Sequence, residues 1–203
     1  MAEQPRRGRP VASSRSTLED AAAELFLERT YAGTSVSDIT QRAGVSRSTF
    51  FNYFSSKSDV LWVTYDESIG RVAARLAAIP PDVPAMTAVR RAFAEATGPI
   101  ESDRVPWAVT QRELMGTTEE LQASGLARFM EQAAVLRRFL AGRTGMPTED
   151  VGVQAAAFAV LGAVAAAAGA WAGAGVTRAP LHTYVDSALA PVCDGFAPVF
   201  LSS

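Results

Sequence analysis

The chain has 203 residues, of which 48% are hydrophobic, and a formal net charge of −2. This length allows one large or two small domains, and the hydrophobic fraction is sufficient for a core. A single cysteine, Cys193, excludes an intramolecular disulfide framework. Because the first residues are polar and charged, we expect no secretory signal and a location in the reducing cytoplasm.

Charge is divided unevenly along the chain. Residues 1–58 contain eight basic and six acidic side chains, whereas residues 59–203 contain eleven basic and fifteen acidic ones. A basic N-terminal part and an acidic remainder would orient the protein on a polyanion.

Residues 1–15 are expected to form a flexible basic arm, because this segment contains two prolines and is unlike a helix. Three arginines in the arm, Arg6, Arg7 and Arg9, could enter the minor groove of DNA. A disordered tail that adds only nonspecific attraction explains the same residues, and the sequence leaves both interpretations open.

The first predicted helix begins with a capping box formed by Ser16 and Glu19. Apolar residues then recur on one face of this helix, at Leu18, Ala22, Leu25 and Phe26. This spacing predicts a supporting helix that ends near residues 31–33.

Residues 34–57 have the pattern of two short helices joined by a sharp turn. Ser35 and Asp38 form a capping box at the start of the first helix. Gly44 can adopt the positive φ that ends this helix, and the Ser46 hydroxyl can cap the next one. The pattern predicts a helix-turn-helix.

The second of these helices, residues 47–53, carries two kinds of side chain. Phe50 and Phe54 are spaced to pack inward. The polar side chains are short enough to reach base edges or phosphates, and they belong to Arg47, Ser48, Thr49, Asn52 and Tyr53. A well-capped hairpin inside a helical bundle is the alternative, but such a hairpin would not need this polar face.

A third capping box, Ser56 with Asp59, starts a longer helix over residues 58–79. Lys57 lies in its first turn, where an ammonium group and free backbone N–H groups could together hold a phosphate. This helix connects the helix-turn-helix to the remainder of the chain, and Pro80 ends it.

Further helices are predicted over residues 85–96, 103–115 and 118–143, and the last one begins near residue 181. Residues 151–177 contain no charge, which raises the possibility of a membrane span. Fifteen of the twenty residues from 155 to 174 are alanine or glycine, however, so their transfer to lipid gains little free energy. We therefore expect a helix of a soluble protein.

Three glycines inside this apolar helix, Gly162, Gly169 and Gly173, each cost about 1 kcal/mol of helix propensity relative to alanine. Close approach of another helix over these small residues would offset the cost. Alternatively, the small residues leave space for a ligand.

The sequence contains no pattern typical of an active site or a metal site. It has one histidine, His182, and one cysteine, and it lacks a glycine-rich phosphate loop and a nucleophile elbow. Glu113, Glu119 and Glu120 are best explained as solvated faces of helices. We expect no catalytic residue, no metal and no cofactor.

The run TSVSDITQRAGVSRSTFFNYFSSKSDVL resembles the DNA-binding domain of the TetR (tetracycline-repressor) family of bacterial regulators over about residues 14–62. The resemblance implies an all-α homodimer that binds double-stranded DNA and releases it when a small molecule binds. It implies DNA contacts from residues 47, 48, 49, 52 and 53, and it adds Ser37 and Lys57. In this chain phenylalanine occupies position 51 where the family usually has tyrosine, so we expect Phe51 only to pack. Thr30 replaces a glycine that commonly ends the first helix.

In the family, the last two helices form a dimer interface. The resemblance therefore assigns the interface to Gly162, Gly169, Gly173, Tyr184, Leu189 and Val192. A twofold dimer predicts a palindromic operator, with half-sites separated by about 34–36 Å or a multiple of this distance.

A narrower resemblance covers about the first ninety residues. The runs RRGRP and LAAIPPDVPAMTAVRRA are similar to regulators of the mycofactocin system, whose implied inducers are acyl-coenzyme A thioesters. The inducer of this chain is not identified by its sequence. Large residues that could line a pocket are Trp62, Tyr65, Trp107, Arg112, Met115, Phe129, Met130, Phe158 and Trp171. For each of these a core position is the better explanation, except for Arg112, which is better explained as a surface arginine.

Together these patterns predict a basic arm (1–15), a helix-turn-helix domain (16–58) and a helical ligand-binding and dimerisation domain (59–203). The predicted function is that of a ligand-responsive dimeric repressor. The alternative is a helical architectural DNA-binding or interaction module without an inducer, which would not discriminate between random and selected DNA.

Overall fold

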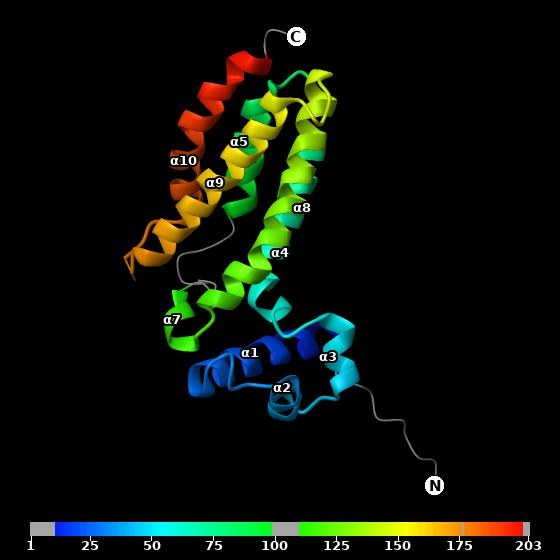
Figure 1. The fold of residues 1–203 in the computed structure, drawn as a ribbon, viewed down its shortest axis with the longest axis vertical. Coiled ribbons are helices and arrows are strands. Elements are labelled where there is room, and N and C mark those ends of the chain that lie inside the picture. The colour runs from blue at the N-terminus through cyan, green and yellow to red at the C-terminus, as the bar shows by residue number, and fades with distance from the viewer. Residues whose placement is uncertain (1–10, 99–109, 176, 201–203) are drawn as a thin grey trace. The chain divides into compact units, whose positions relative to one another are not determined.

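The computed structural model describes residues 11–98, 110–175 and 177–200, and all regular secondary structure in these ranges is helical (Figure 1). The predicted all-α class is therefore confirmed. The α-helices are α1 (Val11–Arg29), α2 (Val36–Ala43), α3 (Arg47–Tyr53), α4 (Asp59–Ala78), α5 (Ala85–Thr97), α7 (Arg112–Met115), α8 (Thr118–Thr144), α9 (Val151–Gly173) and α10 (Leu181–Phe196). A short 3₁₀-helix, η1 (Ala197–Phe200), follows α10.

The contacts divide the described residues into two compact units. The N-terminal unit comprises the described residues up to Val63 together with Gln111–Gln122, and the C-terminal unit comprises the rest. The sequence suggested a simpler boundary after residue 58. The boundary in the structure is different because α7 and the first turn of α8 belong to the N-terminal unit, although they come late in the chain.

The core of the N-terminal unit is built from the inward faces of α1, α2 and α3. The predicted supporting face of α1 is buried, with Leu18, Ala22 and Phe26 each fully inaccessible to solvent. Phe50 of α3 and the following Phe54 pack into the same core, as their spacing predicted. The polar outer face of α3 is thereby left toward solvent.

Helix α1 begins at Val11, five residues before the predicted cap at Ser16. The predicted start was wrong because the helix continues through the capping-box sequence. An ion pair between Arg15 Nε and Glu19 Oε1, at 3.1 Å, spans the residue where the cap was expected and supports the earlier turn.

The end of α1 has an unusual backbone conformation. Thr30 has φ of +64°, and it is the one non-glycine residue with positive φ among the described residues. A β-branched residue is strained there. The turn is held by Thr34, whose buried hydroxyl donates to the carbonyl oxygens of Leu25 at 3.3 Å and Thr30 at 2.9 Å.

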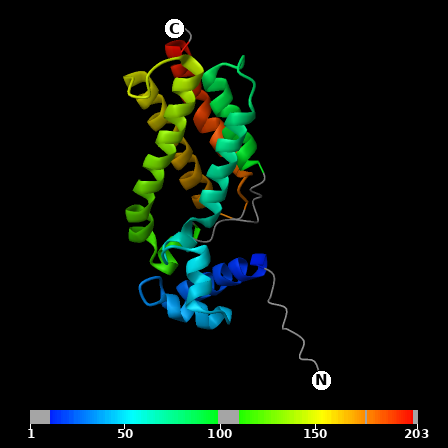
Figure 2. The same ribbon diagram turned by 90° about the vertical axis from the view of Figure 1, so that its right-hand side faces the viewer.

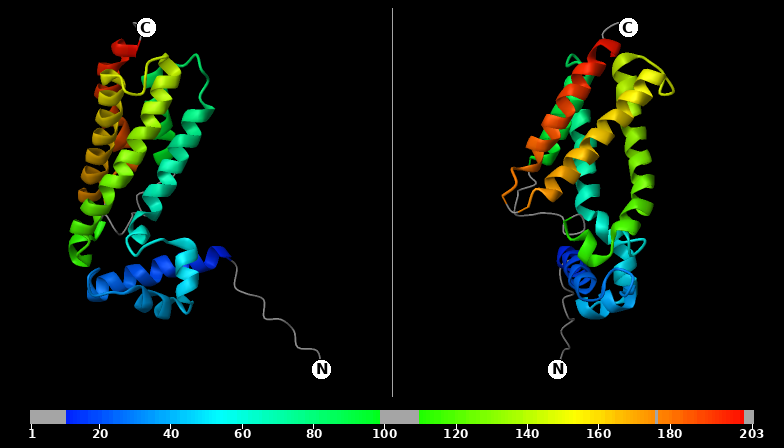
Figure 3. Two further views of the ribbon diagram at one scale, coloured as in Figure 1. Left: turned by 45° about the vertical axis from the view of Figure 1, so that its right-hand side comes forward. Right: turned by 60° about the vertical axis from the view of Figure 1, so that its left-hand side comes forward.

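In the C-terminal unit, α10 packs against both α9 and α5 (Figure 2; Figure 3). The core of the C-terminal unit contains side chains that are at most 2% exposed, such as Val89, Phe93, Leu140, Val160 and Leu189. An ion pair between Arg90 of α5 and Asp186 of α10, with Nε and Oδ1 2.7 Å apart, joins the two helices at the edge of this core.

Helix α9 is the one described helix that is long and apolar enough to cross a membrane. One side of it nevertheless forms part of the protein core, through residues that include Val153, Ala157, Leu161 and Trp171. The Trp171 indole N–H also donates to the carbonyl oxygen of Ala179 at 2.9 Å. These contacts account for the apolar composition of that side without a membrane.

Replacement of Thr30 by glycine is expected to stabilise the protein by about 0.5–1 kcal/mol. Glycine removes a left-handed strain of about 1–2 kcal/mol, and the greater freedom of the unfolded chain offsets part of this gain. Thr30 is exposed, so little burial is lost. Chemical denaturation measures the change.

The matched control is Thr183→Gly, at an exposed position within α10 where the backbone is helical. This substitution should destabilise the protein. Equal destabilisation at both positions would contradict the assignment of strain to Thr30.

Candidate nucleic-acid interface

Helix α2 is fixed at both ends by the residues that the sequence singled out. The Ser35 hydroxyl accepts a hydrogen bond from the Asp38 N–H at 3.2 Å, and the Ser35 N–H donates to Asp38 Oδ2 at 2.8 Å. Gly44, with φ of +67°, ends the helix in the left-handed conformation. Hydrogen bonds from Ser35 hold the pKa of the Asp38 carboxyl below its usual range, so the box is closed at neutral pH.

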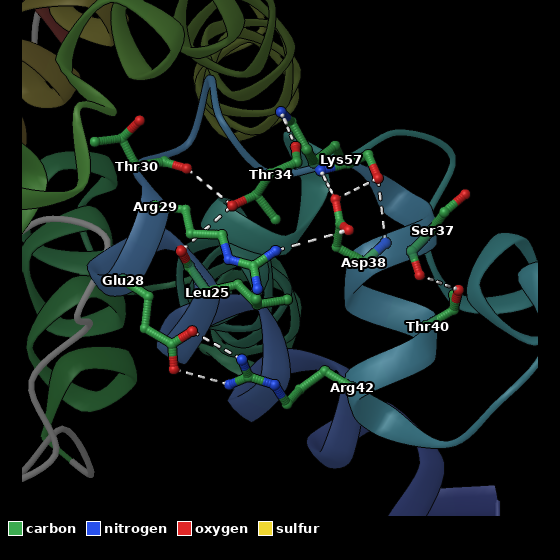
Figure 4. Close-up of polar contacts among 11 residues, drawn as sticks. Leu25, Glu28, Arg29, Thr30, Thr34, Ser37, Asp38, Thr40, Arg42 and Lys57 are labelled. Carbon is green, nitrogen blue, oxygen red and sulfur yellow. Dashed lines mark hydrogen bonds and ion pairs between the residues drawn. The ribbon is translucent and has the colours of Figure 1, made fainter.

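Arg42 ties α2 to α1, as Figure 4 shows. Its guanidinium donates to Glu28 Oε2 at 2.8 Å, which is the contact drawn in the figure. It also donates to Glu24 Oε2 at 3.1 Å. The hydrogen bond from Arg42 lowers the pKa of the Glu28 carboxyl. Sequence reasoning missed this tie, because the two acidic residues are more than ten positions away from Arg42.

Helix α3 begins at a hydroxyl cluster. The Ser46 oxygen accepts from the Thr49 N–H at 3.1 Å, and it lies 2.7 Å from the Ser48 hydroxyl and 2.8 Å from the Thr49 hydroxyl. The cap at Ser46 is as predicted. Two candidate DNA contacts, Ser48 and Thr49, are therefore held in place by their own helix start.

The remaining α3 candidates are available on its outer face. Arg47 and Asn52 are exposed, and Tyr53 is half-buried. Phe51 is 48% exposed, and its ring packs edge-on against Phe50 with the centroids 5.4 Å apart. The Arg47 guanidinium lies over the Phe51 ring, 5.9 Å from its centroid, and this contact limits where the arginine can point.

Ser37, the candidate at the start of α2, is also exposed, and its carbonyl oxygen accepts from the Thr40 hydroxyl at 3.0 Å (Figure 4). This hydrogen bond satisfies the hydroxyl of Thr40, which is only 4% exposed. The unusual threonine in this helix is therefore accommodated inside the unit.

Lys57 has a different environment from the one its sequence position suggested. Its ammonium nitrogen donates to the carbonyl oxygens of Tyr31 at 2.7 Å and Thr34 at 2.8 Å. It also lies 3.8 Å from the centroid of the Tyr31 ring. Burial lowers the pKa of this ammonium group. The arm residues Arg6, Arg7 and Arg9 lie outside the described residues.

The candidate pocket residues are divided between the two units. Trp62, Arg112 and Met115 belong to the N-terminal unit, where Met115 is fully buried and Arg112 is exposed. In the C-terminal unit, Tyr65 is half-buried, Trp171 is a core residue and Met130 is 46% exposed. Trp107 lies outside the described residues.

Two of the pocket candidates, Phe129 and Phe158, contact each other. Their rings stack with centroids 6.0 Å apart, at the edge of the C-terminal core. A cavity of about 440 Å³ lies elsewhere in the same unit, beside the loop between α4 and α5, and its lining includes Pro81, Met86, Arg143 and Phe200. None of the predicted pocket residues lines this cavity.

Three of the four glycines of α9, Gly162, Gly169 and Gly173, are exposed. A Cβ atom added at Gly162, Gly169 or Gly173 would meet no atom within 4 Å. Tyr184 and Val192 of α10 are half-buried. Leu189 is fully buried in the core, so its assignment to a surface that meets another chain was wrong. Its place in the helical repeat did not reveal which side of α10 faces α9.

Among the described residues, no group of three or more histidine, cysteine, aspartate or glutamate side chains could hold a metal ion. Cys193 is buried, and burial raises the pKa of its thiol to about 11. The thiol is therefore protonated and unreactive at neutral pH.

A short capped helix, a left-handed glycine turn and a second helix with a polar outer face together define a helix-turn-helix DNA-binding protein. Comparison of the sequence with known protein families gives the same class of protein. Residues 18–61 match the family described as "Bacterial regulatory proteins, tetR family", and residues 83–197 match the "MftR C-terminal domain". The chain belongs to the TetR family of bacterial transcriptional regulators, which are not enzymes.

Individual relatives support this assignment. The chain is 28% identical over 171 residues to a protein of Mycobacterium tuberculosis named as the mycofactocin biosynthesis transcriptional regulator MftR, and the match covers 84% of this chain and 86% of that protein. Two solved structures share the fold. The fatty acid degradation regulator FadR from Bacillus halodurans has a TM-score of 0.59 at 20% identity, with 96% and 98% of the two chains covered. FadR from Thermus thermophilus, in complex with lauroyl-CoA, has a TM-score of 0.54 at 21% identity, with 89% and 94% covered.

Substitution of Arg47 by alanine is expected to reduce discrimination between selected and random DNA by about tenfold to a hundredfold. An arginine that bonds a guanine edge contributes about 1–3 kcal/mol of discrimination. Fluorescence anisotropy on the two duplexes measures the ratio of affinities.

Arg138→Ala, at an exposed position on α8 in the C-terminal unit, is the matched control and should leave the ratio unchanged. Wild-type discrimination by the Arg47 variant would show that α3 does not read bases through this residue.

Proposed function

We propose that this regulator is a homodimeric cytoplasmic repressor that binds a palindromic operator and is released from it by an amphipathic small molecule of the acyl-CoA class. The observation that carries the proposal is the exposed face of α9 that contains Gly162, Gly169 and Gly173, which we call the glycine face. The exposed polar face of α3 supports the reading of DNA. Membership of the TetR family links DNA binding through α3 with dimerisation through α9.

The glycine face supports a dimer on energetic grounds. Gly162 and Gly169 lie in the interior of α9 and together cost about 2 kcal/mol relative to alanine, and Gly173 is the last residue of the helix. A Cβ atom added at any of the three would meet no atom within 4 Å of the single chain. A second copy packed closely over this face would use the space that the missing side chains leave. A pair related by a twofold axis also presents two α3 helices, which fits a palindromic operator.

Replacement of Gly169 by glutamine separates the stability of the chain from that of the dimer. In the single chain a Cβ atom at this position meets no atom within 4 Å, and glutamine should favour the helix by about 0.5–1 kcal/mol. In the dimer the same side chain would be overpacked, which costs about 1–3 kcal/mol at each of its two copies. We expect unchanged or higher helicity and a dimer dissociation constant raised about tenfold or more, measured by analytical ultracentrifugation.

The control is Gly142→Gln, at an exposed glycine of α8 that also has open space around it. This variant should dimerise like the wild type. If Gly169→Gln dimerised equally well, the glycine face would not be the interface.

The acyl-CoA class is supported by the match to the MftR C-terminal domain and by the fold shared with a FadR protein that binds lauroyl-CoA. The stacked pair of Phe129 and Phe158 supplies aromatic surface at the edge of the core, suitable for an apolar chain. A thioester with a long acyl chain combines such an apolar part with a charged head group.

The direct experiment measures release of a selected palindromic duplex by lauroyl-CoA, with coenzyme A and lauric acid as separate controls. We expect lauroyl-CoA to release the DNA at concentrations where coenzyme A alone has no effect. Retention of DNA at saturating acyl-CoA would exclude this inducer class. Equal affinity for random and selected duplexes would instead favour an architectural DNA-binding module without an inducer.

A further inference from the structure

The cavity of about 440 Å³ lies at one end of the C-terminal unit. The elements that meet there are the α4–α5 loop, the last turn of α8 and η1, which Figure 2 shows at the same end of this unit. Prolines at positions 80, 81 and 84 restrict the main chain of the loop, and the Val83 N–H donates to the Pro80 carbonyl oxygen at 3.2 Å. The cavity is therefore formed by the folded chain before any ligand binds, as small-molecule sites usually are.

The walls of the cavity are mainly apolar. Met86 of α5 is only 2% exposed, and Val83 and Phe200 are half-buried. The other apolar lining residues are Pro81, Pro84, Ala85 and Ala197. The volume lies within the range of about 300–1,000 Å³ in which proteins bind small molecules. Both properties suit a small ligand with an apolar body.

One charged side chain of α8, Arg143, both holds the loop and lines the cavity. Its guanidinium donates to the carbonyl oxygens of Ile79 at 3.0 Å and Val83 at 3.1 Å, and also to that of Pro80. The guanidinium lies over the Phe139 ring, 5.1 Å from its centroid. Because these contacts already fix the guanidinium, a ligand that binds it loses little affinity to side-chain ordering.

The positive charge of Arg143 has no negative partner in the part of the chain that the structure describes. Its hydrogen-bond acceptors are neutral carbonyl oxygens, and none of the described acidic side chains forms an ion pair with it. Three of its five N–H groups are used. The two that remain, on Nε and Nη2, belong to adjacent nitrogens and can bind both oxygens of one carboxylate. The cation is therefore available to an anion that enters the cavity.

Asp82 is the acidic residue among those that line the cavity, and it is exposed. Solvent screens the charge of an exposed carboxylate more strongly than that of a half-buried guanidinium. A ligand with one negative charge is attracted to Arg143, whereas a multiply charged head group would also be repelled by Asp82. The lining thus favours a monoanion.

We propose that this cavity is a second ligand site, which binds a small amphipathic monocarboxylate with its apolar body against Met86 and Phe200 and its carboxylate on Arg143. The site is separate from the stacked rings of Phe129 and Phe158, which do not line it. The inference goes beyond the proposed function and does not depend on it, because it concerns ligand binding by the DNA-free protein.

Octanoate and octanol are matched probes, because they share an apolar chain and differ in the carboxylate. An NMR titration of the DNA-free full chain with isotope-labelled methionine methyl groups follows Met86 in the cavity and Met115 in the core of the N-terminal unit. We expect octanoate to shift the Met86 resonance saturably, to leave Met115 unchanged, and to bind about tenfold or more tightly than octanol. Absence of a saturable Met86 shift, or equal affinity for the two probes, would overturn the proposal.

Thr87 provides a matched pair of variants, because it lines the cavity and is exposed in the first turn of α5. Thr87→Glu and Thr87→Gln differ almost only in charge, and a glutamate near a helix start is favourable, so both should fold. We expect octanoate to bind Thr87→Glu about fivefold or more weakly than Thr87→Gln, with no difference for octanol. Equal octanoate affinity of the two variants would show that the carboxylate does not bind in this cavity.

Arg143→Gln tests the cation directly. Loss of the charge should weaken octanoate binding about tenfold or more and leave octanol binding unchanged. Wild-type octanoate affinity in this variant would overturn the assignment of the carboxylate to Arg143. If the substitution loosens the α4–α5 loop, so that the Met86 resonance of the ligand-free protein moves, the two Thr87 variants decide the question.

Discussion

The N-terminal unit depends on how the main chain between α1 and α2 is satisfied. This turn contains a strained residue, Thr30, and two carbonyl oxygens that accept from Lys57, while its Tyr31 N–H donates to Met115. Buried main-chain polar groups must be paired, and here the partners come from residues that are 23 or more positions away. The start of α2 is consequently fixed by the start of α4 and by α7.

Polar residues in the N-terminal unit and small residues in the C-terminal unit have different roles. In the N-terminal unit, caps and ion pairs such as the one between Arg42 and Glu28 fix two short helices that propensity alone would not hold. Rigid helices allow the exposed side chains of α3 to meet DNA without a large ordering cost. In the C-terminal unit, the core is complete within one chain, yet the glycine face of α9 is left open. Contacts within a single chain do not explain why the C-terminal unit has glycines on that face.

Local signals in the sequence were sufficient for the helix-turn-helix. The caps at Ser35 and Ser46 depend on residues within three positions, so their pattern could be read directly. Properties that depend on tertiary contacts could not be read in this way. The hydrogen bonds of Lys57 to the carbonyl oxygens of Tyr31 and Thr34 join residues 23 or more positions apart, and no local pattern indicated them. Met115 resembles a pocket residue until α7 is seen to pack on α1, and Leu189 shares its helix with residues that are only half-buried. The helices of the C-terminal unit could therefore be predicted from the sequence, but the residues of a ligand pocket could not.

In the proposed function, two copies of the chain read one DNA site through their α3 helices. Selection of bound duplexes from a random pool by the full-length protein tests it most directly. We expect enrichment of an inverted repeat whose half-site centres are separated by about 34–36 Å or a multiple of this distance. Enrichment of a single unrepeated half-site, or no enrichment over the starting pool, would contradict it.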